Sequence, residues 1–385
     1  MRSASIIGVG MTQFGKLSGR GLIDLATEAC RGAVSDAQLT LDKIQAFYLG
    51  NFASEVLVGQ GATAAMVARS VGLHGIPATK VEGACASAGI ALRHAYLAVA
   101  SGLVDIAMAA GVEKMSAAET PVVTAALSCA ADRERDALSG LSFPGFFALV
   151  MRRYMHEFGA SREQVAAVPV KSHDNGANNP KAYLRNRTSV AEVSQSRLIA
   201  DPLRLFDCSP ISDGSAAAIV CPSEMAADLV AQPIRILASI QTLGTTSISD
   251  MATMTTFPAT VEAARQAYAT AKMGPDDVDV VELHDCFSIA EIVDAEDLGF
   301  FRKGEGAVAV AEGATRLNGR VPIKPSGGLL SRGHPVGATG LAQIYEIVQQ
   351  LRGRAINQVA GAEVGLAHNL GGSGAVATIH ILSKN

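Results

Sequence analysis

The 385-residue sequence lacks the features that mark nucleic-acid-binding, secreted and membrane-spanning proteins. It has no basic stretch longer than a doublet, and its net charge of −4 gives no reason to expect nucleic acid or an anionic membrane as a partner. The N-terminus has no secretory core, and Arg93, His94 and Asp105 interrupt the alanine-rich stretch 84–111, so we expect no membrane span. The last three residues lack the leucine of a peroxisomal address. We therefore expect a cytoplasmic protein.

The cysteines form neither a Cys-x-x-Cys pair nor a closely spaced ladder, which excludes a small disulfide scaffold and favours a reducing compartment. The same wide spacing offers no finger-like set of ligands, so we expect no metal site. The six cysteines are Cys30, Cys85, Cys129, Cys208, Cys221 and Cys286.

A hydrophobic content of 49% with 18% charged residues is typical of a globular protein with a large core. Apolar β-type runs alternate with alanine-rich helical stretches, which predicts a layered α/β fold. From about residue 233 the pattern restarts, and CASAGIALRHAY is echoed by GHPVGATGLAQIY, which indicates a duplicated unit. We predict that 1–115 and 206–231 form one half, 116–205 an inserted loop subdomain, and 232–385 the second half.

Two cysteines have neighbourhoods that suggest chemistry. A catalytic thiolate is only about 3% populated at pH 7 without help, and the start of a helix stabilises it. Cys85 precedes small residues that open a predicted helix, whereas Cys286 precedes a helix rich in carboxylates, with Ser288 and Glu291 in a capping-box pattern. We therefore predict a lowered pKa and a nucleophilic role for Cys85, and a neutral thiol that gives or takes a proton for Cys286.

Each residue also has a simpler interpretation. A lone cysteine among alanines is usually a small buried hydrophobic residue. His284 and Cys286 share one face if their strand continues, but as a zinc pair they lack further ligands. His334, near glycine and proline, could cap a turn, and His368 could be a satisfied core residue. Spacing alone decides none of these cases.

The combination of motifs is more specific, and the chain resembles the thiolase family over nearly its whole length. The motifs are VEGACASAG, AAGVEKMS, VELHDCFS, SGGLLSRGHPVGATG and AHNLGGSGA. HDCF stands where conventional thiolases have Asn-Glu-Ala-Phe, which is similar to the branch of sterol carrier protein thiolases and archaeal acetoacetyl-CoA thiolases. The resemblance implies two βαβαββ halves in a five-layered αβαβα architecture, with the insertion binding CoA.

The resemblance also implies roles for the catalytic residues. Cys85 would hold the acyl group, with His334 as its base, and Cys286 would be the acid and base at the carbon that becomes an enolate. His284 would form a first oxyanion hole together with His334.

A second oxyanion hole would use the backbone N–H of Cys85 and one near Gly371, with His368 close by as a further catalytic residue. Ser326 and Gly327, in the Pro-Ser-Gly-Gly stretch, would bind substrate.

The implied activity is CoA-dependent cleavage of a 3-oxoacyl-CoA or the reverse Claisen condensation, with CoA as substrate and no prosthetic group. The expected assembly is a homodimer or a dimer of dimers, with a small zinc-ribbon and OB-fold protein as a further partner. Two alternatives are an acyltransferase that uses a non-CoA acceptor within a multi-subunit complex and a catalytically silent scaffold; the intact Cys85, His334 and Cys286 argue against the scaffold.

Two positions depart from the family pattern, because Lys324 replaces the usual asparagine and Gly372 the usual leucine or isoleucine. These departures leave the acyl group open between acetoacetyl, longer, branched and aromatic substrates.

Overall fold

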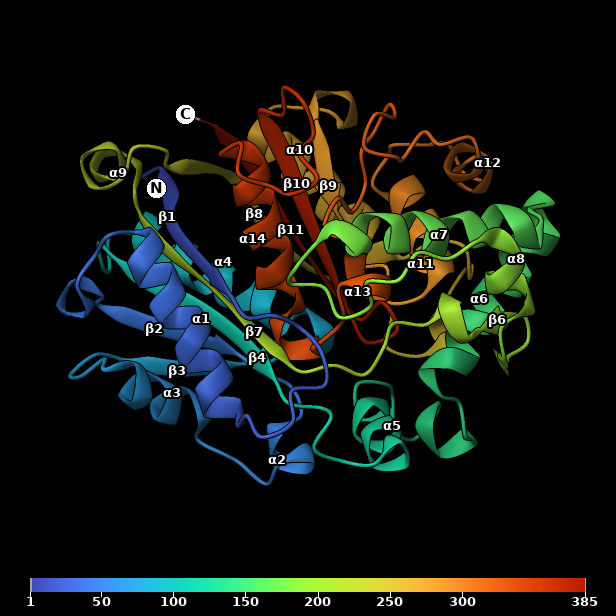
Figure 1. Ribbon diagram of the computed structural model, residues 1–385, viewed down its shortest axis with the longest axis horizontal. Helices are drawn as coiled ribbons and strands as arrows, with labels where there is room; N and C mark the ends of the chain where they lie inside the picture. Colours follow the sequence, from blue (N-terminus) through green and yellow to red (C-terminus); the bar gives the residue numbers. More distant parts are fainter. Residues whose placement is uncertain (1, 385) are drawn as a thin grey trace.

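The computed structural model describes residues 2–384, which form a nine-stranded sheet in the order β3-β2-β4-β7-β1-β8-β11-β10-β9 (Figure 1). The strands of the first half are β1 (Ala4–Met11), β2 (Ala46–Gly50), β3 (Ala78–Val81), β4 (Ala107–Glu113) and β7 (Gly214–Pro222). Those of the second half are β8 (Ile234–Leu243), β9 (Val280–Glu282), β10 (Val364–Gly371) and β11 (Val376–Lys384). The halves join where β1 pairs with β8, through Ser5 opposite Arg235 and Ile6 opposite Ile234.

Helices divide the protein into five layers. α4 (Ser87–Ala100) and α14 (Thr339–Leu351) share one apolar core with strands of both halves, and so form the central layer. α1 (Leu22–Asp36) and α3 (Thr63–Val71) cover the outer face of the first half. α10 (Pro258–Ala271) and α11 (Ser288–Asp297) cover the second. The predicted duplicated α/β architecture is confirmed, and its sheets are buried on both faces.

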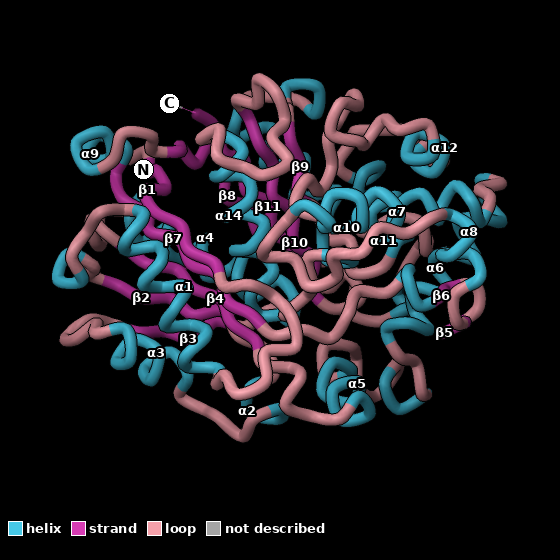
Figure 2. Tube along the Cα trace, viewed as in Figure 1, coloured by secondary structure: helices cyan, strands magenta, loops and turns pink. Residues whose placement is uncertain are grey.

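The insertion adds a helical subdomain beside the second half (Figure 1, green; Figure 2). It contains α5 (Thr120–Ser128), α6 (Phe143–Phe158), α7 (Arg162–Asn178), α8 (Val190–Gln195) and the short strands β5 (Leu198–Ala200) and β6 (Leu203–Arg204). α6 buries its phenylalanines in the same core as α11. The remaining short helices are α2 (Ser54–Leu57), α9 (Ser223–Leu229), α12 (Gly306–Ala311) and α13 (Gly328–Ser331).

The two central helices begin at almost the same place. A Cβ atom on Gly340 would lie 2.5 Å from the backbone nitrogen of Gly89, and one on Gly111 would lie 2.4 Å from the carbonyl oxygen of Gly337. Only glycine permits this approach, which brings the segments that precede α4 and α14 together. Within residues 2–384, no helix has both the length and the apolar character needed to cross a membrane.

Candidate active site

Cys85 lies in a 3-10 turn, Ala84–Ala86, directly before α4. The turn is held by the Ser87 hydroxyl, which donates to the carbonyl oxygen of Ala84 at 2.6 Å and accepts from the N–H of Gly83 at 3.1 Å. Ala84 has a φ of 51°, in the left-handed region that residues with a Cβ rarely adopt. This sharp turn places the Cys85 thiol on the wall of a pocket.

That pocket has a volume of about 250 Å³ and is also lined by His284, Cys286 and His334. One donor atom from each of Cys85, His284 and His334 lies within 4.8 Å of the others. The fold therefore brings together four of the five residues predicted to be catalytic. A thiolate and two imidazoles are also ligands that zinc accepts, so these three side chains are where a soft cation would bind.

The hydrogen bonds of His334 fix its tautomer. Its Nδ1 lies 2.6 Å from Thr339 Oγ1, and the Thr339 hydroxyl donates to the carbonyl oxygen of Pro335 at 3.1 Å. Because a hydroxyl has only one hydrogen, Nδ1–H must donate to Thr339, which leaves the lone pair on Nε2. The backbone N–H of His334 donates to Ser212 Oγ at 2.8 Å and secures the loop. His334 is thus arranged to accept a proton at Nε2.

His284 has the opposite arrangement. Its Nδ1 accepts from the Asn369 side-chain amide at 3.0 Å, so Nε2 carries the hydrogen. The His284 and His334 rings lie 5.0 Å apart between centroids, at 80° to each other. Burial lowers the pKa of His284 well below its usual range and that of His334 to about 3. One neutral histidine can therefore donate a hydrogen bond while the other accepts a proton.

The predicted lowering of the Cys85 pKa is wrong. Burial, together with the nearby Glu113 carboxyl, raises the pKa of this thiol to about 12. The backbone N–H groups of Gly372 and of Cys85 itself favour the thiolate, but they do not offset desolvation. The pKa of Glu113 is itself raised to about 7 by burial. Cys85 is therefore a neutral thiol at rest and must give its proton to a base.

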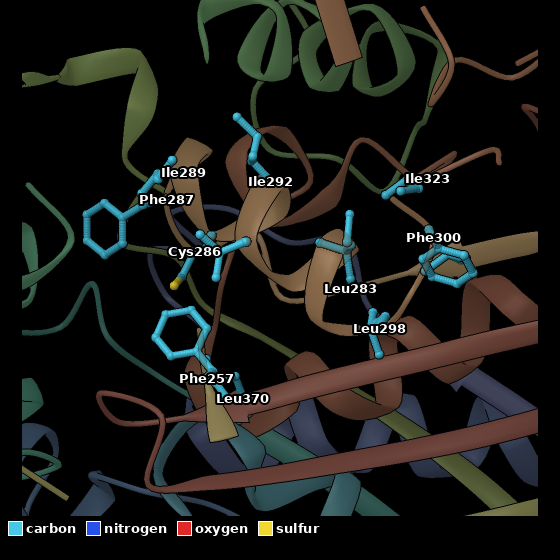
Figure 3. Close-up of a cluster of buried hydrophobic side chains, with 14 of the residues drawn as sticks. Phe257, Leu283, Cys286, Phe287, Ile289, Ile292, Leu298, Phe300, Ile323 and Leu370 are labelled. Carbon is cyan, nitrogen blue, oxygen red and sulfur yellow. The ribbon is translucent and has the colours of Figure 1, made fainter. Parts of the chain in front are cut away.

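Cys286 lies in an apolar environment, and Figure 3 shows the rings of Phe257 and Phe287 on either side of its sulfur. Burial raises its pKa well above the usual range, and Cys85 and the carboxyls of Asp294 and Asp285 raise it further. The neutral thiol predicted for Cys286 is confirmed.

The capping box predicted after Cys286 is absent. α11 begins after Phe287 without a side-chain cap, and the Ser288 hydroxyl donates to Asp207 at 2.7 Å. Glu291 is buried in ion pairs, which hold its carboxylate away from the start of the helix.

Glycines close the pocket opposite Cys85, at the end of β10. The N–H that reaches the Cys85 sulfur belongs to Gly372, whereas we predicted Gly371. A Cβ on Gly371 would lie 2.3 Å from the carbonyl oxygen of Gly83, so Gly371 instead permits the close passage of the two loops. Gly372 has a φ of 62°, and this left-handed turn explains the one-residue shift.

Three other predicted residues do not line the pocket. His368 is fully buried, with Nε2 3.0 Å from Thr260 Oγ1. Ser326 donates to Glu282 at 2.8 Å, and a Cβ on Gly327 would meet the backbone of Gly176. The contacts of Ser326 and Gly327 are structural ones, so the structure does not support their predicted role in binding substrate. A direct catalytic role for His368 stays a prediction.

Sequence reasoning missed a buried charge cluster behind the pocket. Lys324 Nζ lies 2.6 Å from Asp285 Oδ2 and also contacts Glu291, whose other oxygen lies 2.5 Å from Lys171 Nζ. Asp285 stands between His284 and Cys286 in the chain and accepts a further bond from the N–H of Leu329 at 2.8 Å. Two cations and two carboxylates thus balance within the protein and hold the loop that carries His284 and Cys286. In the sequence, the only feature that indicates this charge cluster is Lys324, the lysine that departs from the family pattern.

A duplicated α/β fold with two cysteines and two neutral histidines that line one pocket defines an enzyme class that transfers acyl groups through a cysteine. A model of the thiolase N-terminal domain matches residues 4–224, and a model described as thiolase C-terminal domain-like matches 241–384.

Individual proteins show the same relationship. The chain is 48% identical to the acetyl-CoA acetyltransferase of Methanothermobacter thermautotrophicus, over 100% of both chains. It is 36% identical to human sterol carrier protein 2, over 98% of this chain and 71% of that protein. A solved structure described as "Ltp2-ChsH2(DUF35) aldolase" superposes with a TM-score of 0.86 at 28% identity, over 99% of this chain and 98% of that one. The chain belongs to the thiolase family, and it is a thiolase-type acyl-CoA C-acyltransferase.

The raised pKa of Cys85 predicts how the empty enzyme reacts with iodoacetamide. Because only the thiolate is alkylated, the rate at Cys85 should rise about tenfold per pH unit between roughly pH 7 and 10. Peptide mass spectrometry at several times and pH values measures this rate. A rate that is independent of pH would contradict the prediction, because it would reveal a preformed thiolate.

The charge cluster predicts a large loss of stability on Lys324→Met. The substitution leaves Asp285 and Glu291 with fewer partners inside the protein, and breaking a buried pair in this way costs about 3–5 kcal/mol. Lys43→Met is the matched control, because Lys43 pairs with Asp42 at the exposed surface, where a pair contributes less than about 1 kcal/mol. Urea unfolding gives both values, and equal losses in the two variants would show that the cluster does not stabilise the fold.

Proposed function

We propose that this protein cleaves a 3-oxoacyl-CoA with CoA, or runs the reverse Claisen condensation, through an acyl group held on Cys85. The observation that supports this proposal best is the meeting of Cys85 and Cys286 with two neutral histidines of opposite tautomer in one pocket. Acyl transfer needs a nucleophile and a base, and breaking a carbon–carbon bond needs a separate acid. The site offers one side chain for each task.

In the first half-reaction, the Cys85 proton moves to Nε2 of His334 and the thiolate attacks the 3-keto carbon. The Gly372 N–H, which already reaches the sulfur, is placed to donate to the tetrahedral oxyanion. The bond between carbons 2 and 3 then breaks, leaving an acyl group on Cys85. Nε2–H of His284 stabilises the enolate oxygen, and the Cys286 thiol protonates carbon 2 to release acetyl-CoA.

In the second half-reaction, the thiol of CoA gives its proton to the Cys286 thiolate and attacks the acyl carbon. Cys85 leaves and recovers its proton from His334, so the enzyme returns to its neutral state. CoA would approach past the insertion, which contributes Ile199 to the pocket.

We also propose that the protein works as a homodimer, with the small zinc-ribbon and OB-fold protein as a further partner. β3 is the edge strand of the sheet and, among residues 2–384, pairs on one side only, so its other edge is free for a second copy. For the small partner, the support is that the description of the solved neighbour joins Ltp2 to ChsH2(DUF35).

Cys286→Ala tests whether the two cysteines act in different steps of the reaction. Thiolysis of acetoacetyl-CoA should fall by roughly 10²–10⁴-fold, because the enolate loses its proton donor, whereas label exchange between CoA and acetyl-CoA should be largely retained. Cys85→Ala should abolish both rates, and His334→Ala should lower both. The two rates are measured at saturating substrate, with circular dichroism as the folding control. Complete loss of exchange in Cys286→Ala would assign Cys286 to acyl transfer instead.

The homodimer predicts a mass by light scattering of twice that of one chain. Ala78→Pro should lower that mass, because the N–H of Ala78 faces the free edge of β3, away from β2, and proline cannot donate a hydrogen bond there. Thr188→Pro, in the loop before α8, is the matched control and should leave the mass unchanged. A monomeric wild-type protein would contradict the proposal.

A further inference from the structure

The pocket has two apolar walls that meet at the reacting residues. Around Cys85, the side chains of Met115, Leu127 and Val336 form one apolar cluster. Leu127 belongs to α5, whose residues Thr124 and Thr120 face the same pocket one and two turns earlier. α5 is therefore the outer wall of the space in which an acyl group on Cys85 would lie.

The opposite wall, around Cys286, is aromatic. Phe143, Phe147 and Phe287 line the pocket there, and the Phe147 and Phe287 rings are stacked with centroids 4.6 Å apart at 24°. With Phe52, four of the chain's 12 phenylalanines face this one cavity. Among the described residues, no lysine, arginine, aspartate or glutamate lines it.

The size of the cavity exceeds what an acetyl unit needs. Its volume of about 250 Å³ is many times the ~10–15 Å³ that one water molecule needs on the same measure, and the end of the CoA arm that reaches Cys85 shares this space. The methyl group of acetoacetyl-CoA would leave much of the apolar wall in contact with water.

From the walls and the volume we infer that the substrate is a 3-oxoacyl-CoA whose acyl group is uncharged, apolar and larger than acetyl, with a flat ring as the best fit. Leu127 and the phenylalanine wall are the residues that select it. This inference rests on the proposed function. A carboxylate at the end of the acyl chain would lose its hydration with no cation in the pocket to replace it, so the site rejects such chains. Each buried methylene favours transfer by about fourfold, and ring-on-ring contact adds roughly two- to tenfold.

The test compares CoA-dependent cleavage of three substrates: acetoacetyl-CoA, 3-oxo-3-phenylpropanoyl-CoA and 3-oxoadipyl-CoA. The expected kcat/KM is at least tenfold higher for the phenyl substrate than for acetoacetyl-CoA, and at least tenfold lower for 3-oxoadipyl-CoA than for the phenyl substrate. Leu127→Trp, which fills the space beside Cys85, should lower the ratio of phenyl to acetoacetyl kcat/KM at least tenfold.

Leu138→Trp is the matched control, because Leu138 is 67% exposed and lies outside the pocket; this variant should leave the ratio unchanged. If Leu127→Trp fails to fold by circular dichroism, Leu127→Phe should shift the ratio in the same direction. A wild-type protein that cleaves acetoacetyl-CoA as well as or better than the phenyl substrate overturns the inference and leaves the proposed function standing. Cleavage of none of the three overturns both.

Discussion

The site depends on the close approach of α4 and α14 between the two halves of the sheet. The backbone atoms around Gly89 and Gly340 lie too near for any Cβ, so the two helices begin side by side. The loop before α4 carries Cys85, and the loop before α14 carries His334. The nucleophile and its base are almost 250 positions apart in the chain. They meet because Gly89 and Gly340, which lie behind them, have no side chains to keep the two helices apart.

The apolar surroundings of the site determine the protonation states of its residues. Burial keeps the Cys85 and Cys286 thiols and the two imidazoles neutral. The division of labour between the histidines comes from residues that do not face the substrate, since Thr339 holds the hydrogen of His334 on Nδ1 and Asn369 holds that of His284 on Nε2. In the proposed mechanism, these thiols and imidazoles become charged only while they react with a substrate.

The sequence predicted the layered fold because the alternation of strands and helices restarts in the second half, and the motifs predicted the meeting of Cys85, His284, Cys286 and His334. The sequence predictions were wrong for properties that depend on residues distant in the chain. The pKa of Cys85 follows desolvation by segments distant in the chain, and the donor shifted from Gly371 to Gly372 because a left-handed turn moves the N–H. The acceptor of the Ser326 hydroxyl, the buried Glu282, also comes from a segment 44 positions away in the chain.

The charge cluster behind the pocket has a consequence for the order of folding. Lys171 belongs to the insertion, Asp285 and Glu291 to the segment after β9, and Lys324 to a loop further on, so the four charges meet only when these segments have docked. Desolvating any one of them alone is strongly unfavourable. The insertion, the segment after β9 and the loop with Lys324 are therefore expected to dock in one cooperative step. The loop with His284 and Cys286 becomes ordered in that same step. A chain that has collapsed without its insertion in place would have its sheet, but the loop with His284 and Cys286 would lack Lys171 among the charges that hold it.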